Sequence, residues 1–531
     1  MIVHRKKALA PVLGVVLAMT ALACTSNSSS SGASGSTTPQ VFTFATTSSV
    51  TTWDPTQSFS TEATYMPNLY EGLLVVNPPG SATPYTPALA TSWEHSSDGL
   101  TWTFHLRTGV TFHDGSTFDA NAAKKSIDYE AKNAAASFIW APLKSVKVID
   151  DNTIEMDLSY AAPMELIVGS TYGAWMVSPT AIDGVSKNAK YFDKGIDAGT
   201  GPYMLDGYTP DQEVDFKAYP NYWGGWDGPH VSDVVAKIVP EDSQQQQMLD
   251  GGDVDLATRV PPEALAGYAS NPDFAVTSNP SWFNYTAFFN TLRPPLDNPK
   301  VRQALSYAIP YQDIINVAFL GHASQSFGAV PQGVYPFSDQ IPQYTTDLTK
   351  AAQMLSDAGY PNGGFTLNLT YASENPVEAK MAPLIQDSFK KIGVTVNVKA
   401  ILFNQQWEAA KSDPKNAQDI FLLLYWPTYA DAGTDNLYSM FHCATPPFFN
   451  LSYWCNKQFD KDIDTAATLE VTNPSKAQDL YNQAQTLMVN EAPAGFLVDT
   501  EETFAMSSHL QGFVYNENYP FSFSFYGLSL A

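Results

Sequence analysis

Basic residues are scarce in this sequence. Its 531 residues include 28 Lys and Arg against 53 Asp and Glu, which gives a formal net charge of −25. The first 23 residues hold three of the basic residues and no acidic one, so a chain without them has 25 against 53, a net charge of −28. Such a surface repels phosphate backbones and offers no basic stripe. We therefore do not expect nucleic-acid binding.

Recognisable catalytic motifs are missing too. The sequence has no G-x-S-x-G elbow, HExxH helix, Walker loop or GxGxxG, and its eight histidines show no ligand spacing. Two Ser-x-x-Lys matches, at Ser388 and Ser412, lack the S-D-N and K-T-G partners of penicillin-recognising enzymes. His113 and Asp114 precede Gly115 in a predicted turn rather than forming an acid–base pair. We expect no enzyme, cofactor or metal centre, although paired carboxylates for hydrolysis depend on three-dimensional spacing and stay open.

Long apolar runs are absent, apart from one at the amino terminus. Arg5–Lys7 precedes the uncharged apolar run Ala8–Leu22, which ends at the small residue Ala23. The run is too short to span a bilayer stably. Its flanks predict a secretory signal over residues 1–23, and hence export.

A cysteine follows this signal directly. Ala21–Cys24 resembles a bacterial lipobox, with Ala21 where Leu is usual. The resemblance implies that Cys24 is lipidated and anchors the protein to the outer face of the cytoplasmic membrane; an ordinary signal peptide with an incidental cysteine is the alternative. Thr25–Thr38 is almost wholly Ser, Thr, Gly and Asn, so we interpret residues 24–40 as a lipidated cysteine and flexible tether.

The remaining cysteines are Cys443 and Cys455. In an oxidising compartment they should form a disulfide, and closing so short a loop contributes about 3 kcal/mol in the chain-entropy model. A metal site is the alternative. Only His442 lies near them, and no second Cys-x-x-Cys or His pair completes four ligands.

The body of roughly 490 residues is long enough for two or three domains. In its first part, Val41–Ala45 and Thr101–Arg107 have strand patterns and Glu62–Leu73 has helical spacing. Asp119 is placed to cap a helix through Ala120–Glu130. A hairpin follows, with strand residues on either side of a turn at 150–152.

From about residue 290, strand and helix patterns alternate. Phe365–Tyr371, Val377–Ile392 and Val394–Val398 predict a right-handed β-α-β unit with parallel strands. Ile420–Leu424 predicts a fully buried strand that leads into Tyr425 and Trp426. Ligands of open α/β sheets lie beyond the carboxyl ends of strands, so these two aromatics stand where a ligand would be met.

Aromatic residues are abundant: 11 Trp, 27 Tyr and 30 Phe. Their flat faces and polar tips suit ligand contacts, although packing is the ordinary role of most of them. Eight fall in segments predicted to be loops: Trp53, Trp282, Phe283, Tyr285, Trp407, Tyr425, Trp426 and Tyr429.

Several ordered strings resemble the extracytoplasmic solute-binding proteins of ABC importers, in the family 5 cluster of dipeptide, oligopeptide and nickel binders. The resemblance runs from about residue 41 to the carboxyl terminus. The strings are YEGLLVV from Tyr70, LATSWEHSSDGLTWTFHLRTGVTFHDG from Leu89, GTGPY from Gly199, GGDVDLA from Gly251, VRQALSYAI from Val301 and AAQMLSDAGY from Ala351.

The resemblance implies an α/β fold with two lobes, the class II periplasmic-binding-protein or Venus-flytrap type, with an extra subdomain inserted in lobe I. Lobe I would comprise residues 41–70, 198–285 and 491–531, the inserted subdomain 71–197, and lobe II 286–490. A small peptide or peptide-like solute would bind between the lobes, and hinge closure would present it to membrane permease subunits. A monomer is expected.

YWPTYAD, from Tyr425 to Asp431, resembles the family's W-x-x-D-Y-x-D-P signature at the interlobe face. The first aspartate, which receives the ligand's amino terminus in peptide binders, aligns with Thr428. Asp431 aligns with the second, and Ala432 replaces the proline. A neutral hydroxyl cannot supply the charge-assisted bond that a free ammonium uses.

The predicted ligand contacts are an aromatic wall of Tyr425 and Trp426 and polar contacts from Thr428 and Asp431. Phe403 and Trp407 are weaker candidates. An exported hydrolase using carboxylates, and a structural or adhesive lipoprotein, are the alternative functions.

Overall fold

The computed structural model describes residues 40–58, 61–429, 431–444 and 449–531. The predicted signal, Cys24 and the tether lie outside the described residues, apart from Gln40. Within the described part, no helix combines the length and apolarity needed to cross a membrane.

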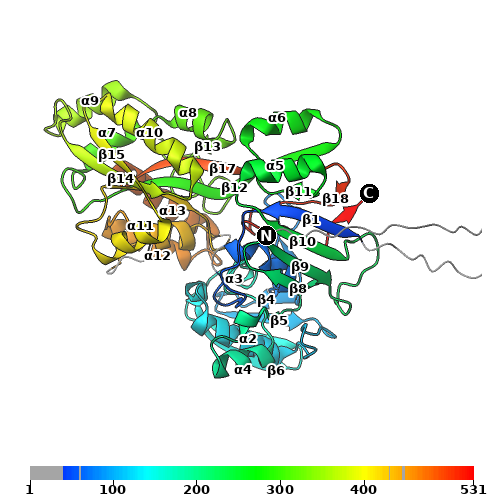
Figure 1. Cartoon of the computed structure of the whole chain (residues 1–531). Helices are drawn as coiled ribbons and strands as arrows, with labels where there is room; N and C mark the ends of the chain where they lie inside the picture. Colours follow the sequence, from blue (N-terminus) through cyan, green and yellow to red (C-terminus); the bar gives the residue numbers. More distant parts are fainter. Residues whose placement is uncertain (1–39, 59–60, 430, 445–448) are drawn as a thin grey trace, which may run out of the picture. The chain divides into compact units, whose positions relative to one another are not determined.

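An eleven-stranded mixed sheet extends through the fold (Figure 1). Its strand order is β15-β14-β16-β12-β17-β11-β1-β10-β9-β8, with β13 paired to β17. Two long strands in the middle, β12 (Phe274–Phe289) and β17 (Ala494–Ser507), pair antiparallel along most of their length. The strands on either side of this pair belong to two separate lobes, so the chain passes between the lobes along β12 and β17.

Lobe I lies on the β1 side of the sheet. Its strands are β1 (Val41–Thr46), β8 (Tyr203–Thr209), β9 (Glu213–Ala218), β10 (Asp233–Ile238) and β11 (Leu256–Ala257), with the carboxyl-terminal pair β18 (Leu510–Gln511) and β19 (Ser529–Leu530). Its helices are η1 (Thr61–Thr64), α1 (Met66–Leu69), α5 (Asp242–Gly251) and α6 (Pro262–Ser270). From the inserted segment, α4 (Pro179–Lys187) and η3 (Phe192–Lys194) pack on the lobe I core. Phe42 and Phe44 pack with Phe523 and Phe525 in its core, which fixes the carboxyl-terminal segment to lobe I.

Lobe II lies on the other side of β12 and has a core on each face of its strands. Its strands are β13 (Ala323–Gln325), β14 (Thr366–Ala372), β15 (Thr395–Ile401) and β16 (Ile420–Tyr425). Its helices are α7 (Pro299–Ala308), α8 (Tyr311–Asp313), η4 (Ile314–Ala318), α9 (Leu348–Asp357), α10 (Pro376–Lys390), α11 (Phe403–Ser412), η5 (Gly433–Ser439), α12 (Lys457–Ala467) and α13 (Pro474–Glu491). β14 and β15 are parallel and joined by α10, which confirms the predicted β-α-β unit.

A subdomain with its own core is inserted in lobe I. A four-stranded antiparallel sheet in the order β4-β5-β7-β6 carries it. Its elements are β2 (Leu74–Val76), β3 (Tyr85–Pro87), β4 (Ala90–His95), β5 (Thr101–Leu106), α2 (Ala120–Asn133), η2 (Ser137–Trp140), β6 (Leu143–Asp150), β7 (Thr153–Leu158) and α3 (Met164–Val168). Trp102 and Phe104 of β5 alternate inward, and Asp119 caps α2 by accepting from the Ala122 amide, as predicted.

Some sequence expectations were wrong. Trp282, Phe283 and Tyr285 lie in β12 and Trp407 in α11 rather than in loops, because tertiary pairing overrides the turn-like Ser-Asn-Pro-Ser before them and the helix of α11 continues through Trp407. The helical spacing over 62–73 gives only η1 and α1, and the backbone becomes extended at Tyr70.

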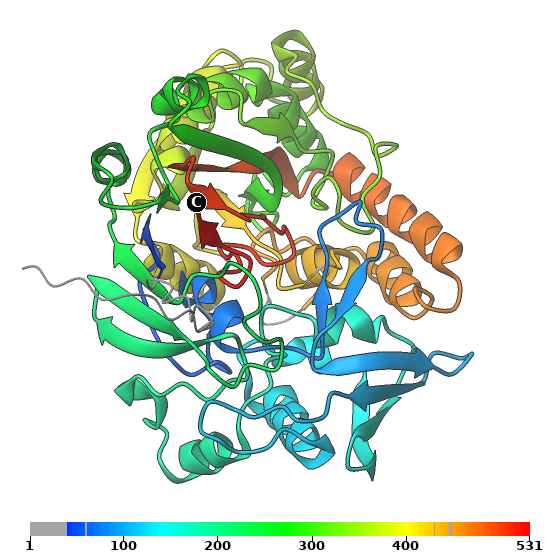
Figure 2. The ribbon, with the colours of Figure 1, turned by 90° about the vertical axis from the view of Figure 1, so that its right-hand side faces the viewer.

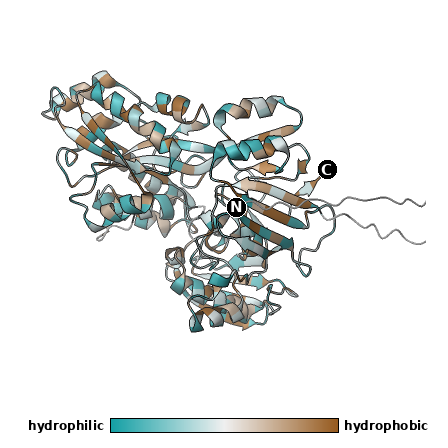
Figure 3. Ribbon diagram, viewed as in Figure 1, coloured by the Kyte–Doolittle hydropathy of each residue, from teal (hydrophilic) through white to brown (hydrophobic). Residues whose placement is uncertain are grey.

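Helix α5 contains four consecutive glutamines, at positions 244–247. The helix is largely hydrophilic in Figure 3, but Gln245 is buried. Its amide donates to the Val239 carbonyl and accepts from the Arg259 amide, which explains how a polar side chain is accommodated there.

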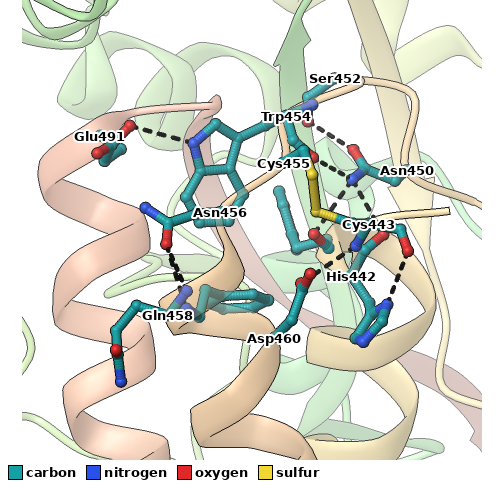
Figure 4. Close-up of a disulfide and its surroundings, with 12 residues drawn as sticks. His442, Cys443, Asn450, Ser452, Trp454, Cys455, Asn456, Gln458, Asp460 and Glu491 are labelled. Atoms are coloured by element: carbon teal, nitrogen blue, oxygen red, sulfur yellow. Dashed lines mark hydrogen bonds between the residues drawn. A yellow bond between two sulfur atoms is a disulfide. The ribbon is translucent and has the colours of Figure 1, made fainter.

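The predicted Cys443–Cys455 disulfide is present (Figure 4). Asp460 of α12 accepts from the Cys443 amide at 3.1 Å, and Asn450 donates to the Trp454 carbonyl at 2.8 Å. The loop between the cysteines is thereby fastened to α12 as well as closed on itself.

The His113-Asp114 pair and the Ser-x-x-Lys match at Ser388 form hydrogen bonds that stabilise the fold. His113 lies 2.7 Å from Asp197 through Nδ1, whereas Asp114 accepts from Ser116, so the two neighbours do not form an acid–base pair. Ser388 donates to the Ala308 carbonyl at 2.6 Å inside lobe II, which makes it a packing residue.

Glu130 of α2 is fully buried, and neither carboxylate oxygen has a hydrogen-bond partner among the described residues. Burial, with a contribution from Asp54, raises its pKa well above 4.5. Its protonated form stabilises the fold below the unfolded-state pKa, and this contribution is lost as the pH rises toward the folded-state pKa.

We predict that Glu130→Gln raises the unfolding temperature at pH 8 and flattens its fall between pH 5 and 8, because the amide has no proton to lose. Thermal unfolding followed by circular dichroism across this range measures both effects. Glu408→Gln, at an exposed position of α11, is the matched control and should leave the profile unchanged. A Glu130→Gln profile parallel to the wild type would contradict the assignment.

Candidate functional site

The predicted ligand segment begins at the carboxyl end of β16. Tyr425 is the last residue of that strand, and the following residues run toward Asp431 across the end of the sheet. Thr428 is 2% exposed and Asp431 0% exposed, whereas Tyr425 and Trp426 are half-buried. The segment therefore lies inside the protein.

This lobe II segment is buried against the inserted subdomain. Tyr429 is 7% exposed and belongs to the subdomain's own hydrophobic core, and Trp426 packs against that core. The Ser170 hydroxyl lies 3.1 Å from the Thr428 carbonyl oxygen, to which it donates. The segment is thus the face of lobe II that meets the subdomain.

An aromatic contact also joins the segment to lobe I. Phe521, from the carboxyl-terminal segment, meets the Trp426 ring edge-on with centroids 5.9 Å apart. Its other face stacks on Phe283 of β12 at 4.7 Å. Phe521 has a φ of +65°, a conformation that non-glycine residues rarely adopt and that the surrounding packing must maintain.

Asp435 holds the segment from behind. Its carboxylate accepts from the Tyr425 hydroxyl at 2.6 Å and from the backbone amides of Thr428 and Tyr429. It is fully buried in the π-helix η5, and burial raises its pKa to about 7 despite these hydrogen bonds. Asp435 thus fixes both the aromatic and the polar predicted contacts.

Two further carboxyl groups, those of Asp431 and Glu470, lie beside Asp435. Asp431 accepts from the Gly433 amide at 2.9 Å and the Thr434 hydroxyl at 2.8 Å, and it is within hydrogen-bonding reach of Glu470. Glu470 in turn accepts from the Tyr481 hydroxyl. Burial raises the pKa of both carboxyls, and mutual repulsion raises that of Glu470 further, so the pair retains a proton.

Side chains of the subdomain face this pair. Burial first, and then the carboxylates of Glu165 and Asp431, raise the pKa of Tyr85 above 10. Burial and nearby acids, Asp431 and Glu470 among them, do the same for Tyr160. These hydroxyls stay protonated at neutral pH, so the interlobe face combines aromatic surface, hydroxyl donors and carboxyl groups.

Phe403 and Trp407 lie elsewhere in lobe II. Both are on α11, with ring centroids 5.7 Å apart, and Trp407 also contacts Phe421 and Phe449. Their described ring partners all belong to lobe II, and both rings pack against the same hydrophobic cluster of that lobe as Tyr425.

Within the described residues, the group with metal-ligand geometry is Cys443, Cys455 and Asp460. Both sulfurs are already joined in the disulfide, which removes them as ligands.

Sequence reasoning missed Asp435, Glu470, Tyr85 and Tyr160. Asp435 lies one helical turn after Asp431, and this spacing was the available signal for it. The others come from segments far apart in the chain, which only the tertiary fold brings together.

The long strand pair between two lobes and the buried interlobe face define a two-lobed solute-binding protein. Residues 84–447 match the model of the bacterial extracellular solute-binding proteins, family 5. The chain belongs to this family, which confirms the predicted membership and the two-lobed fold.

Two relatives are each 30% identical to the chain. The glutathione-binding protein GsiB of Pectobacterium atrosepticum matches over 445 residues, 82% of this chain and 84% of the relative. Heme-binding protein A of Haemophilus influenzae matches over 483 residues, 85% of each.

Solved structures share the fold. A dipeptide-binding protein of a Pseudoalteromonas species, in complex with Met-Leu, has a TM-score of 0.79 at 22% identity and covers 93% of this chain and 100% of its own. The substrate-binding protein CtaP of Listeria monocytogenes has a TM-score of 0.81 at 21% identity, covering 93% and 99%.

We predict that Asp435→Asn destabilises the protein by about 1–3 kcal/mol, because the new amide NH2 faces a backbone N–H that loses its acceptor. Tyr425→Phe removes the hydroxyl that bonds to Asp435 and Ser439 but leaves the backbone N–H groups their acceptor, so it should cost less, about 0.5–1.5 kcal/mol. Asp464→Asn, at an exposed position of α12, serves as the control. Urea unfolding measures all three.

The stability of Asp435→Asn relative to the wild type should also depend on pH. With a folded-state pKa of about 7 and an ordinary value of 3.8, Asp435 loses stabilisation as the pH rises between these values. The stability difference between wild type and Asp435→Asn should therefore shrink from pH 4 to pH 7. A difference independent of pH would show that Asp435 is already ionised at low pH.

Proposed function

We propose that this protein is the lipid-anchored receptor of an ABC importer, which captures a small peptide or peptide-like solute between its lobes and delivers it unchanged to the membrane permease. Family membership supports solute binding. The observation that carries the proposal is the burial of the Tyr425–Asp431 segment of lobe II against the inserted subdomain, which is the contact expected when two lobes enclose a ligand.

The proposal includes the predicted organisation of the chain. Residues 1–23 act as the export signal and Cys24 as the lipid attachment site, with a monomeric body beyond the tether. Lobe I comprises 41–70, 198–285 and 491–531, the subdomain 71–197 and lobe II 286–490.

The proposed contacts are the aromatic faces of Tyr425 and Trp426 and the polar groups of Thr428 and Asp431. Thr428 lacks the negative charge that a ligand ammonium would need, but Asp435 lies directly behind it, with its Oδ1 3.5 Å from the Thr428 hydroxyl. Because burial raises the pKa of Asp435 to about 7, this carboxyl is partly protonated at neutral pH, so the position suits the polar groups of a peptide-like solute better than a free ammonium.

The relatives suggest probes. Glutathione is a peptide, and the Met-Leu complex is a dipeptide bound by the same fold, so both belong to the class proposed here. We choose glutathione and Met-Leu for the first binding measurements.

A hydrolase is less well supported. Glycoside hydrolysis needs two carboxyl groups roughly 5–10 Å apart. Asp431 and Glu470 are within hydrogen-bonding reach of one another, which is closer than either mechanism uses. This carboxyl pair therefore gives no support to glycoside hydrolysis.

We predict that Trp426→Ala weakens binding of the preferred probe at least tenfold, because the ring contributes contact area at the interlobe face. Isothermal titration calorimetry with glutathione and with Met-Leu measures the loss. Trp226→Ala, a half-buried tryptophan of lobe I packed on Tyr203 and Tyr526, is the matched control for a lost ring. Equal affinities for the two variants would remove Trp426 from the site.

A further inference from the structure

A second part of lobe II contacts the inserted subdomain. The loop between α12 and α13 contains Val471, which packs against the subdomain's hydrophobic core. Figure 2 shows these two helices, in orange, beside the blue strands of the subdomain. This contact is separate in sequence from the Tyr425–Asp431 segment and comes from another element of the lobe.

Gly99 is the subdomain residue at this contact. It occupies the turn between β4 and β5 with a φ of +68°. A Cβ at Gly99 would lie 2.9 Å from Ala161 Cβ and 3.2 Å from Val471 Cγ1. The backbone of the turn therefore lies directly against Val471, with no room for a methyl group between them.

The turn cannot easily move aside. Asp98 accepts from the Ser96 hydroxyl and the Leu100 amide, and the Gly99 carbonyl accepts from the indole of the buried Trp102. The Leu100 carbonyl is bonded to the Leu158 amide of β7. These hydrogen bonds fix the turn to the subdomain sheet, so it meets lobe II as a rigid surface.

The two contacts of lobe II lie on either side of its buried carboxyl pair. Tyr429 precedes Asp431 by two residues, and Val471 follows Glu470 directly. Tyr429 and Val471 both pack on the same subdomain core. The subdomain therefore covers the carboxyl pair from two points, one of which, Val471, is not among the proposed ligand contacts.

We propose that the contact of Val471 with the Gly99 turn stabilises the closed arrangement of the two lobes, and so sets ligand affinity without touching the ligand. The inference rests on the proposed function, in which the lobes open and close around a solute. A contact present only in the closed state raises the population of that state, and the apparent affinity follows that population. Removing it should weaken binding about three- to tenfold.

The glycines of the subdomain allow a matched test. Gly99→Ala places a methyl group against Val471, whereas Gly109→Ala introduces alanine at a similar φ of +77° with nothing within 4 Å. Both variants bear the same kind of backbone strain, and only the first obstructs the contact. Because Gly99→Ala also approaches Ala161, the double variant with Val471→Ala isolates the part due to lobe II.

The readout is the distance between lobes in the full mature chain without added ligand. Spin labels attached through p-acetylphenylalanine at Ile149 of the subdomain and Leu402 of lobe II, both more than half exposed, report it by pulsed electron resonance. Gly99→Ala should shift the distribution toward longer distances and Gly109→Ala should not. Val471→Ala alone should enlarge the longer-distance population. In the double variant it should reverse part of the shift caused by Gly99→Ala. Circular dichroism confirms that each variant is folded.

Three results would overturn the inference: equal distance distributions for Gly99→Ala and Gly109→Ala, an unchanged distribution with Val471→Ala, or a probe that binds wild type and Val471→Ala with equal affinity. Calorimetry with glutathione and with Met-Leu separates this from the proposed function. If neither probe nor any co-purified solute binds while the distances respond as expected, the closure contact stands and the receptor function fails. If a probe binds with equal affinity to wild type and Val471→Ala, the closure contact fails alone.

Discussion

The arrangement of the interlobe face depends on the buried carboxylate of Asp435. A loop that leaves a sheet must find partners for its backbone N–H groups when it is buried, and here one side chain accepts from the amides of Thr428 and Tyr429 and from the Tyr425 hydroxyl. With these bonds made, Tyr429 can enter the core of the inserted subdomain and the Thr428 carbonyl can meet Ser170. The contact of this segment with the subdomain therefore depends on Asp435.

The two strands that connect the lobes have their own polar anchor. β12 and β17 lose register between Pro280 and Asn284, and Asp499 of β17 pairs with Asn284 just beyond this irregularity. The Asp499 carboxylate accepts from the Ser326 hydroxyl at 2.6 Å and the Gln332 amide at 3.0 Å, both in lobe II. A second irregularity follows between Tyr285 and Thr286, so the strand pair is irregular on both sides of the residue pair that anchors lobe II.

Local patterns predicted the parts of the fold that depend on local physics. The alternation in β5, the cap at Asp119 and the β-α-β unit around α10 were confirmed because period and capping act within a few residues. The aromatics of β12 were predicted to lie in loops, but a partner strand more than 200 residues away decides their structure.

The candidate site was predictable only in part, for the same reason. The carboxyl end of β16 located Tyr425 and Trp426, and the family resemblance located Thr428 and Asp431. Glu470, three residues beyond the end of α12, is within hydrogen-bonding reach of Asp431, and Tyr85 of the subdomain is near enough for the Asp431 charge to raise its pKa. No spacing in the sequence encodes either relation. Phe403 and Trp407, chosen as aromatics preceding the strand, are directed by α11 into the packing of lobe II.

In the proposed function, two lobes enclose a solute and release it without chemical change. Native mass spectrometry of the protein purified from its own host, followed by identification of what is released on denaturation, tests this most directly. We expect one small molecule per chain, which binds again to the stripped protein and is recovered unchanged on a second denaturation. A molecule recovered from this second step with a different structure would mean that a bond had been made or broken, and the receptor interpretation would be wrong.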